Sequence, residues 1–348
     1  MAESIVPISP SSSDDRLRTF YAARRVAVTG GAGFIGSHLT SALAELGAEV
    51  SVIDDLSNSS VSRIVGLIDR YPGRVSLVEG SILEPAALSE AFERCGTVFH
   101  QAAMVSVPRS MEEPERTMFV NTLGTTRVAQ AARASGATRL VYAASSSAYG
   151  DSEELPKRED MPERPLSPYA VSKLAGEHVV RAWATGFGLD GVSLRYFNIF
   201  GEGQPADSPY SAVIARFAAL LQAGEAVTVF GDGEQSRDFT HVTNAVRANL
   251  LAGAAPDRLN GQVVNIGCGQ ATTISRLVRR LADRLGVDRP QVEHAPDRAG
   301  DVRHSHADIA AAKNLLGYEP VLTFEQGLDQ MLQGGIDPID RGVIGKIG

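Results

Sequence analysis

The sequence is poor in cysteine and has no long apolar run. Its two cysteines, Cys95 and Cys268, stand far apart in the chain, in no metal-binding or redox spacing. This usage is typical of a reduced, cytoplasmic protein. No segment is long and apolar enough to span a membrane, and the first residues lack the basic-then-apolar order of a signal peptide. We therefore expect a protein with no membrane partner.

A concentration of positive charge is also missing. The chain has 33 Lys and Arg against 41 Asp and Glu, a formal net charge of -8, and no basic block. This argues against nucleic acid as a partner. An anionic ligand is not excluded, because a few buried arginines bind one whatever the net charge. With 348 residues, 43% of them hydrophobic, the chain is large enough for two lobes.

From Arg24 onward, short β-branched runs alternate with helical stretches. The runs are continuously apolar, which predicts parallel strands covered on both faces. They are residues 24–30, 49–55, 74–80, 97–103, 139–145 and 191–198. Strand and helix in alternation predict an α/β fold, a Rossmann-type doubly wound parallel sheet. Segments rich in Gly and Pro follow Asn198 and predict a smaller C-terminal α/β substrate lobe. The expected order is a flexible leader over 1–22, the Rossmann domain over 23–198 with 238–268 added, a discontinuous lobe over 199–335, and a tail over 336–348.

The segment "VTGGAGFIGSHL" follows the first predicted strand and opens a helix. Gly31, Gly33 and Gly36 fit G-x-G-x-x-G, and Gly30 with the last two fits G-x-x-G-x-x-G. Either register lets the backbone approach a pyrophosphate at a helix N-terminus. Asp54 follows about 20 residues on, where a carboxylate accepts from ribose hydroxyls; the alternative is a helix cap. No arginine directly follows Asp54 to meet a 2′-phosphate, which favours NAD over NADP.

The segment "LSPYAVSKLAGEH" places Tyr169 and Lys173 four residues apart, on one face of a helix that Ser167 caps and Pro168 begins. A free tyrosine has a pKa of about 10, and lowering it by about 3 units takes about 4 kcal/mol. One cation at about 4 Å supplies energy of that order. Lys173 and the positive nicotinamide ring of NAD⁺ are two such cations, so we expect a basic Tyr169. The alternative is a pair on an exposed helix face.

Three serines, Ser145 to Ser147, stand in "AASSSAYG" at the end of a predicted strand. The Gly-rich turn, the serine run and the tyrosine helix, in that order, resemble the extended short-chain dehydrogenase/reductase family over Arg24 to Gly317. The resemblance implies a catalytic triad of Ser145, Tyr169 and Lys173. It also implies the following NAD contacts: Gly30, Gly33, Phe34, Ile35, Gly36, Asp54, Asp55, Ser57, Asn58, Ser81, Ile82, Gln101, Ala102, Ala103, Tyr169, Lys173 and Phe197. Ser81 stands where the family often has Asp.

The serine run contains no acid. Dehydratases of the family carry Thr-Asp-Glu at these places, and decarboxylases keep a Glu. Serine cannot abstract the proton that elimination requires. What remains is oxidation at C4, turnover of the ketose and return of the hydride, which is the reaction of a 4-epimerase. The alternative is that the serines only end a strand or cap the next turn.

Four further segments resemble the UDP-hexose 4-epimerases, in particular the branch acting on UDP-N-acetylglucosamine. They are "SVPRS", "RYFNIFG", "FGDGEQSRDF" and "DRAGDVRHSHADI". The resemblance implies these UDP-sugar contacts: Ser106, Ser145, Ser146, Ser147, Tyr169, Asn198, Ala212, Val213, Thr228, Phe230, Arg237, Arg298, Asp301 and Ser305. Glucose-restricted epimerases have a tyrosine at the position of Ser305, and serine leaves room for an acetamido group. Val105 stands where relatives have lysine or glycine.

We therefore expect an NAD-dependent UDP-N-acetylglucosamine 4-epimerase that also accepts UDP-glucose, forms a homodimer and binds no metal. The histidines near Asp301 are ascribed to a substrate loop. A UDP-glucuronate 4-epimerase would need a cation facing the sugar carboxylate, and the loop after Asn198 offers none. A catalytically inactive NAD-sensing regulator is the non-enzyme alternative, against which the intact triad argues.

Overall fold

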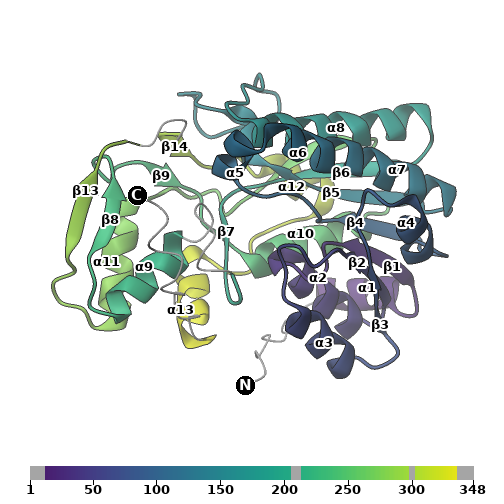
Figure 1. The fold of residues 1–348 in the computed structure, drawn as a ribbon, viewed down its shortest axis with the longest axis horizontal. Coiled ribbons are helices and arrows are strands. Elements are labelled where there is room, and N and C mark those ends of the chain that lie inside the picture. The colour runs from purple at the N-terminus through teal and green to yellow at the C-terminus, as the bar shows by residue number, and fades with distance from the viewer. Residues whose placement is uncertain (1–11, 205–212, 298–301, 335–348) are drawn as a thin grey trace.

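The computed structural model describes residues 12–204, 213–297 and 302–334, and within these ranges the largest sheet has seven parallel strands (Figure 1). Their order is β3-β2-β1-β4-β5-β6-β11. The strands are β1 (Arg25–Thr29), β2 (Glu49–Asp54), β3 (Val75–Glu79), β4 (Thr97–His100), β5 (Arg139–Ser145), β6 (Asp190–Tyr196) and β11 (Gln262–Ile266). Each of the six expected runs forms a strand, and the doubly wound parallel sheet is confirmed. The strand order reverses between β1 and β4.

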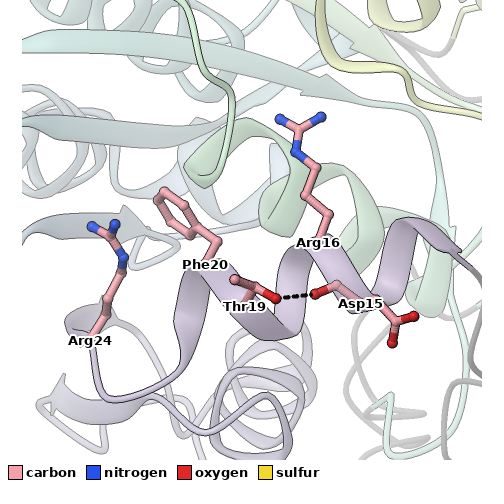
Figure 2. Close-up of a pocket in the computed structure, with 5 residues that line it drawn as sticks. All are labelled: Asp15, Arg16, Thr19, Phe20 and Arg24. Atoms are coloured by element: carbon pink, nitrogen blue, oxygen red, sulfur yellow. Dashed lines mark hydrogen bonds between the residues drawn. The ribbon is translucent and has the colours of Figure 1, made fainter.

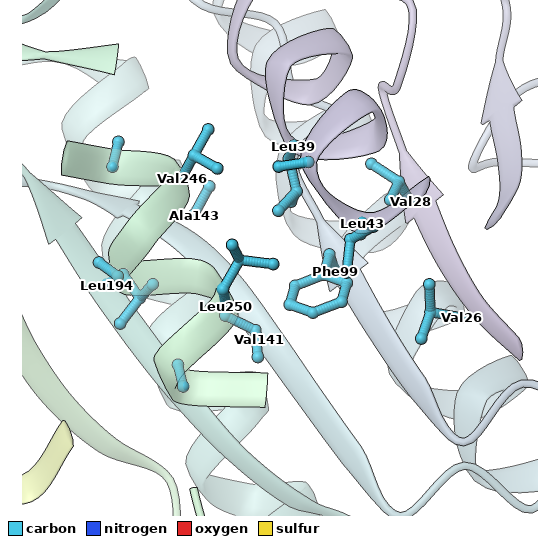
Figure 3. Close-up of a cluster of buried hydrophobic side chains, with 14 of the residues drawn as sticks. Val26, Val28, Leu39, Leu43, Phe99, Val141, Ala143, Leu194, Val246 and Leu250 are labelled. Atoms are coloured by element: carbon cyan, nitrogen blue, oxygen red, sulfur yellow. The ribbon is translucent and has the colours of Figure 1, made fainter. Parts of the chain in front are cut away.

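Helices cover both faces of this sheet. The helices that pack together on one face are α2 (Phe34–Glu45), α3 (Val61–Arg70), α10 (Val242–Gly253) and α12 (Ala310–Leu316). Those on the other face include α4 (Pro85–Ala91), α7 (Gly124–Ala134) and α8 (Pro168–Gly186). Strand β5 serves both cores, because Val141 and Ala143 lie in the first one (Figure 3) and Leu140, Tyr142 and Ala144 in the second. Alternate residues of a strand point to opposite faces, so a continuously apolar strand is what two covered faces require.

Part of the expected flexible leader is a helix, α1 (Ser12–Tyr21). Leu17 and Tyr21, one helical turn apart, are buried against the core of the first face, and the Tyr21 hydroxyl donates to the carbonyl oxygen of Leu250 at 2.8 Å. Two apolar residues are too few to show a helical period in the sequence, which is why the expectation was wrong for this stretch. Residues 1–11 of the leader and the expected tail 336–348 lie outside the described residues.

The second lobe lies on the left in Figure 1. Its core packs α9 (Val213–Gln222), α11 (Ile274–Leu285) and α13 (Phe324–Gly334) around the parallel pair β8 (Val227–Phe230) and β13 (Val292–Ala295). Short strands complete it: β7 (Ile199–Phe200), β9 (Ser236–Arg237), β10 (Thr240–His241), β12 (Thr272–Thr273) and β14 (His304–Ser305). The smaller C-terminal α/β lobe is thereby confirmed. The stretch 238–268 contributes α10 and β11 to the large domain.

Candidate active site

Predicted cofactor, catalytic and substrate residues lie at the carboxyl edge of the large sheet. Gly30 follows β1, Asp54 ends β2, Gln101 follows β4, Ser145 ends β5, and Asn198 stands two residues beyond β6. In open parallel sheets, ligands bind outside this edge where the strand order reverses. The predicted cofactor and catalytic residues therefore share the edge at which this fold binds ligands.

The Gly-rich turn fits a pyrophosphate. Gly30 has a φ of 69° and donates its N–H to the carbonyl oxygen of Ile53 at 2.8 Å. A Cβ atom on Gly36 would lie 2.0 Å from the Gly30 carbonyl oxygen, so only glycine permits this close packing. Helix α2 begins after Gly33 with no side-chain cap and no acidic residue in its first turn, which contains Phe34 and Ile35. Its first N–H groups and the helix dipole therefore suit an anion.

Asp54 braces this turn. One carboxylate oxygen accepts from the N–H of Ala32 at 2.9 Å, and the other accepts from the N–H of Leu56 at 2.9 Å and the Ser59 hydroxyl at 2.8 Å. Helix α3 begins after Ser60, whose side chain makes no capping hydrogen bond, and Asp54 lies six residues before it, so the helix-cap alternative for Asp54 is not what the structure shows. Each carboxylate oxygen accepts more than one hydrogen bond, and Asp54 retains the capacity to accept from ribose hydroxyls.

The other predicted cofactor residues surround these two features. Asp55 accepts from the N–H and the hydroxyl of Ser57, and Asn58 accepts from the Arg109 guanidinium at 3.1 Å. The Ser81 hydroxyl oxygen, in the loop after β3, accepts from the N–H of Leu83. Ala102 donates its N–H to Thr29, while Ile82 is buried and Ala103 partly buried in loops at the same edge.

Two predicted cofactor residues are engaged within the protein. The Gln101 side chain donates to Asn249 at 3.0 Å and accepts from the Tyr196 hydroxyl at 3.2 Å. The Phe197 side chain is fully buried in a small cluster with Tyr149. A cofactor contact at Phe197 would therefore have to come from its main chain.

Tyr169 and Lys173 lie on α8 as predicted, with Pro168 beginning the helix and Ser167 accepting from the N–H of Ala170 at 3.2 Å. Tyr169 is partly buried and hydrogen-bonds with Ser145. The Lys173 ammonium donates to the carbonyl oxygen of Ala143 at 2.7 Å and lies 5.0 Å from the centre of the Tyr142 ring. The helix thus brings the tyrosine and the lysine to the end of β5, where the serine run begins.

The protein's own groups do not make Tyr169 basic. Burial raises the pKa of Tyr169, and the hydrogen bond with Ser145 opposes this. Burial lowers the pKa of Lys173 to about 7, against the charge of Glu177. The expected basic Tyr169 relied on Lys173 together with the nicotinamide ring of NAD⁺, and without the second cation the pKa of Tyr169 stays raised by burial. A buried lysine that holds its proton weakly supplies little field, and the remaining positive charge has to come from a bound cation.

The serine run turns from strand to helix. The Ser145 hydroxyl oxygen accepts from the N–H of Ser147 at 3.2 Å and from its hydroxyl at 2.9 Å. Ser145 thereby caps the short 3-10 helix Ser146–Tyr149. The capping alternative and the hydrogen bond with Tyr169 hold for the same residue, because a hydroxyl both donates and accepts.

A buried ion cluster below this site escaped the sequence reasoning. Arg195 of β6 is completely buried and binds both oxygens of Glu177 at 2.8 and 2.7 Å, and Glu163 at 3.1 Å. Its guanidinium lies 4.6 Å from the centre of the Tyr149 ring. Two signals pointed to it: a charge inside an apolar strand, and a glutamate one turn after Lys173.

His100 is packed, not exposed to the site. It is 1% exposed and hydrogen-bonds with Thr29 at 2.7 Å and Thr125 at 2.9 Å. Burial, with a smaller contribution from Lys173, lowers its pKa to about 3. The imidazole is therefore neutral at physiological pH and supports the core at the end of β4.

The second lobe carries the predicted substrate residues. Ser305 of β14 stands opposite Arg237 of β9 in a parallel pair, and the Arg237 guanidinium donates to the main chain of Ser236 and Arg303. Val213 begins α9, and Thr228 and Phe230 lie on β8. Ser106 caps the helix α5 (Val107–Glu112), and Asn198 has a positive φ of 28°. Ala212, Arg298 and Asp301 lie outside the described residues.

One strand pairing joins the serine run to the substrate lobe. Lys157, in the loop after the 3-10 helix, bridges to Ala307, two residues after Ser305, and its N–H donates to His306 at 2.9 Å. Val105 is 60% exposed beside Ser106. The loop after the serine run and the segment that follows Ser305 are therefore in direct contact.

Comparison with known proteins identifies the family. The model of the "NAD dependent epimerase/dehydratase family" matches residues 26–267. The chain belongs to this family. A UDP-glucose 4-epimerase of Mycolicibacterium smegmatis is 34% identical over 314 residues, 89% of this chain and 97% of the relative.

Solved structures agree with this assignment. A UDP-N-acetylglucosamine 4-epimerase from Methanobrevibacter ruminantium, in complex with UDP-N-acetylmuramic acid, has a TM-score of 0.85 at 33% identity and covers 91% of this chain and all of its own. A UDP-glucose 4-epimerase of Thermus thermophilus in complex with NAD has a TM-score of 0.80 at 33% identity, covering 89% and 98%. Decarboxylases and dehydratases are also among the similar proteins.

The epimerase/dehydratase enzyme uses NAD, and its residues fit this cofactor. The uncapped start of α2 and the packed glycines suit the pyrophosphate, and Asp54 suits the ribose. No helix of the described residues is long and apolar enough to cross a membrane. Within the described ranges, no three His, Cys, Asp or Glu side chains are placed to hold a metal ion.

Proposed function

We propose that the enzyme interconverts UDP-N-acetylglucosamine and UDP-N-acetylgalactosamine by inverting C4, with UDP-glucose and UDP-galactose as secondary substrates. The observation that carries the proposal is the placement of the proposed triad: Ser145 ends β5, and Lys173, one helical turn after Tyr169 on α8, donates to the carbonyl oxygen of Ala143 at 2.7 Å, two residues before Ser145. The side chains of Ser145, Ser146 and Ser147 carry hydroxyl groups and no carboxylate. They support proton transfer at C4 and offer neither the acid nor the base of an elimination.

The chain's own residues handle the proton. Tyr169 takes the proton of the C4 hydroxyl, and Ser145 holds the C4 oxygen and relays that proton. NAD, held by the Gly-rich turn, the start of α2 and Asp54, would supply a reversible hydride acceptor for C4, and the 4-keto sugar turns over in the pocket so that its opposite face is presented for the return. Tyr169 then gives its proton back to the C4 oxygen. Lys173 stabilises the Tyr169 phenolate when the lysine is in its charged, ammonium form.

The preference for an N-acetyl sugar rests on Ser305. In the parallel pair of β14 with β9, Ser305 stands opposite Arg237, the residue that we propose binds the diphosphate. A small side chain next to a diphosphate-binding arginine leaves space for an acetamido group, which a tyrosine would fill. The resemblance to the Methanobrevibacter ruminantium enzyme supports the same choice. We propose that Asn198, Arg298 and Asp301 complete the UDP-sugar contacts.

We propose a homodimer formed by the helices at the top of Figure 1. Three large apolar side chains are exposed there: Met111 on α5 by 63%, Phe119 after α6 (Pro114–Met118) by 51%, and Val171 on α8 by 40%. These helices pack together, so the exposed residues belong to one helical layer. An apolar layer of this kind suits burial against a second copy.

The proposal is tested by incubating the purified enzyme with UDP-N-acetylglucosamine, UDP-glucose or UDP-glucuronate, without added NAD, and separating the epimers by chromatography. We expect the fastest turnover for the N-acetyl sugar and none for the glucuronate. Ser305→Tyr should remove the N-acetyl activity and preserve or raise the glucose activity. Equal loss of both activities would contradict the role of Ser305, and turnover of the glucuronate alone would replace the proposal with a glucuronate epimerase.

A further inference from the structure

Two adjoining hollows lie at the amino edge of the large sheet, at the opposite end of the strands from the candidate active site. The larger has a volume of about 500 Å³ and is lined by residues of α1 and the turn after it, which Figure 2 shows. The smaller has a volume of about 240 Å³ and is lined at the starts of β4, β5 and β6. Phe20 and Arg24 line both, so the two hollows form one continuous surface.

The lining is rich in arginine. Four arginines and two aspartates line the two hollows, in a chain with a net charge of -8. Arg139 and Asp190 neutralise each other in a buried ion pair at 2.7 Å. Asp15 lies at the outer end, on the exposed side of α1. The remaining positive charge is therefore spread along both hollows, with Arg16 in the larger, Arg258 in the smaller and Arg24 where they meet.

Three guanidinium groups of this surface make no ion pair with a described carboxylate. Arg24 lies over the ring of Phe20, 4.1 Å from its centre. Arg16 donates to the carbonyl oxygen of Ala254 at 3.2 Å, and Arg258 makes contacts of 3.4 Å or longer with neutral oxygens. In the described part of the chain, none of the three forms an ion pair with a carboxylate. Guanidinium groups left in this way are donors for a phosphate.

The surface does not belong to the active site. Strand β5 begins at Arg139, in the smaller hollow, and ends at Ser145, so the length of the sheet separates the two. Helix α1 also precedes residues 26–267, the part matched by the family model. Leu17 and Tyr21 hold α1 on the core. The helix thus presents Arg16, Phe20 and the following Arg24 from a firmly packed support (Figure 2).

We propose that this surface binds a phosphate-bearing anion, separate from the substrate. Its phosphate groups lie between Arg24 and Arg258 in the smaller hollow, and the rest of the ligand extends past Phe20 toward Arg16. The volumes suit a molecule of the size of an inorganic polyphosphate or a nucleoside triphosphate. Both share the polyphosphate chain, and a nucleoside would add contact with Phe20.

Calorimetry of the NAD-containing enzyme with saturating UDP, which occupies the nucleotide-sugar site, tests the proposal with inorganic tripolyphosphate as the probe. We expect one added site per chain, weakened at least about ten-fold in Arg24→Ala/Arg258→Ala. The matched control, Arg279→Ala/Arg289→Ala, removes two exposed arginines of the second lobe and should bind as the parent does. ATP binding more tightly than tripolyphosphate identifies a nucleotide ligand, and equal affinity identifies a free polyphosphate.

Three results would overturn the proposal: no binding up to about 10 mM, binding unchanged in Arg24→Ala/Arg258→Ala, or equal weakening in the control pair, which would indicate a general effect of net charge. Arg237→Ala serves as a further control. Loss of tripolyphosphate binding in Arg237→Ala, with binding unchanged in both double variants, would assign the probe to the substrate lobe instead. Unfolding midpoints of all variants establish that each is folded.

Discussion

Replacing Lys173 with methionine should stabilise the NAD-free enzyme below pH 7 and abolish turnover. Burial lowers the pKa of Lys173 from 10.5 to about 7. Between these values the unfolded chain binds more protons than the folded one, so the stability of the parent rises with pH in that window. The difference corresponds to a penalty of about 5 kcal/mol below pH 7, which disappears by about pH 10.5.

Methionine fills a similar volume without this penalty, but it loses two contacts of the ammonium. The hydrogen bond to Ala143 at 2.7 Å is worth about 1.5–3 kcal/mol, and the contact with the Tyr142 ring about 0.5–2 kcal/mol. Both contacts belong to the ammonium and are already contained in its net penalty, so Lys173→Met should be more stable than the parent by about 4 kcal/mol below pH 7. Above pH 10 the amine is neutral and keeps only an ordinary hydrogen bond, so the variant should be less stable there by about 1 kcal/mol.

Urea unfolding of both proteins at a series of pH values from about 6 to about 10 measures this difference. Lys313→Met is the matched control, because Lys313 is exposed and pairs with Glu319 at the surface, where such a pair contributes about 0–1 kcal/mol. The difference between Lys173→Met and its parent should change sign with pH, and that of the control should stay small. A constant loss of stability at every pH would show that the buried ammonium carries no titration penalty and that Lys173 is only a structural contact.

Two further substitutions test the support of the site. Gly36→Ala should yield protein that no longer retains NAD, because its Cβ would lie 2.0 Å from the Gly30 carbonyl oxygen. The retained NAD is measured by absorbance after denaturation. The control Gly66→Ala, with no atom within 4 Å of the added Cβ, should retain NAD, and equal retention in both variants would count against the close packing. Glu177→Gln leaves the buried Arg195 without its bidentate partner and should lower the free energy of unfolding by about 3 kcal/mol. Glu154→Gln, in an exposed pair with Arg158, should change it by less than about 1 kcal/mol, and similar losses in the two variants would show that the buried pair is not special.

The large sheet could be predicted because its strands are buried on both faces. A strand covered on both faces requires an uninterrupted apolar run, which is visible in the sequence. The start of the tyrosine helix is visible as well, because Ser167 is a typical capping residue and Pro168 a typical first helical residue. Local rules were enough to place Tyr169 and Lys173 on one face. The position of Asp54 at the end of β2 followed from the same strand pattern.

Features that depend on distant contacts could not be predicted. Helix α1 has two buried apolar residues, and its burial depends on α10, more than 200 residues away in the chain. The strands β9, β12 and β14 have two residues each, too few for any period, and they pair across segments of more than 30 residues. The weak basicity of Lys173 arises from how deeply α8 packs on β5, which the spacing of Tyr169 and Lys173 does not reveal.

The fate of the hydrogen at C4 distinguishes epimerisation through a 4-keto sugar from elimination or from exchange with water. UDP-N-acetylglucosamine with deuterium at C4 is incubated with the enzyme in ordinary water, and the UDP-N-acetylgalactosamine formed is examined by mass spectrometry and NMR. We expect deuterium to remain at C4 of the product with inverted configuration, and Tyr169→Phe to slow the conversion by a factor of about 10²–10⁴. Exchange of the label into water, or a 4-keto-6-deoxy product, would contradict this expectation.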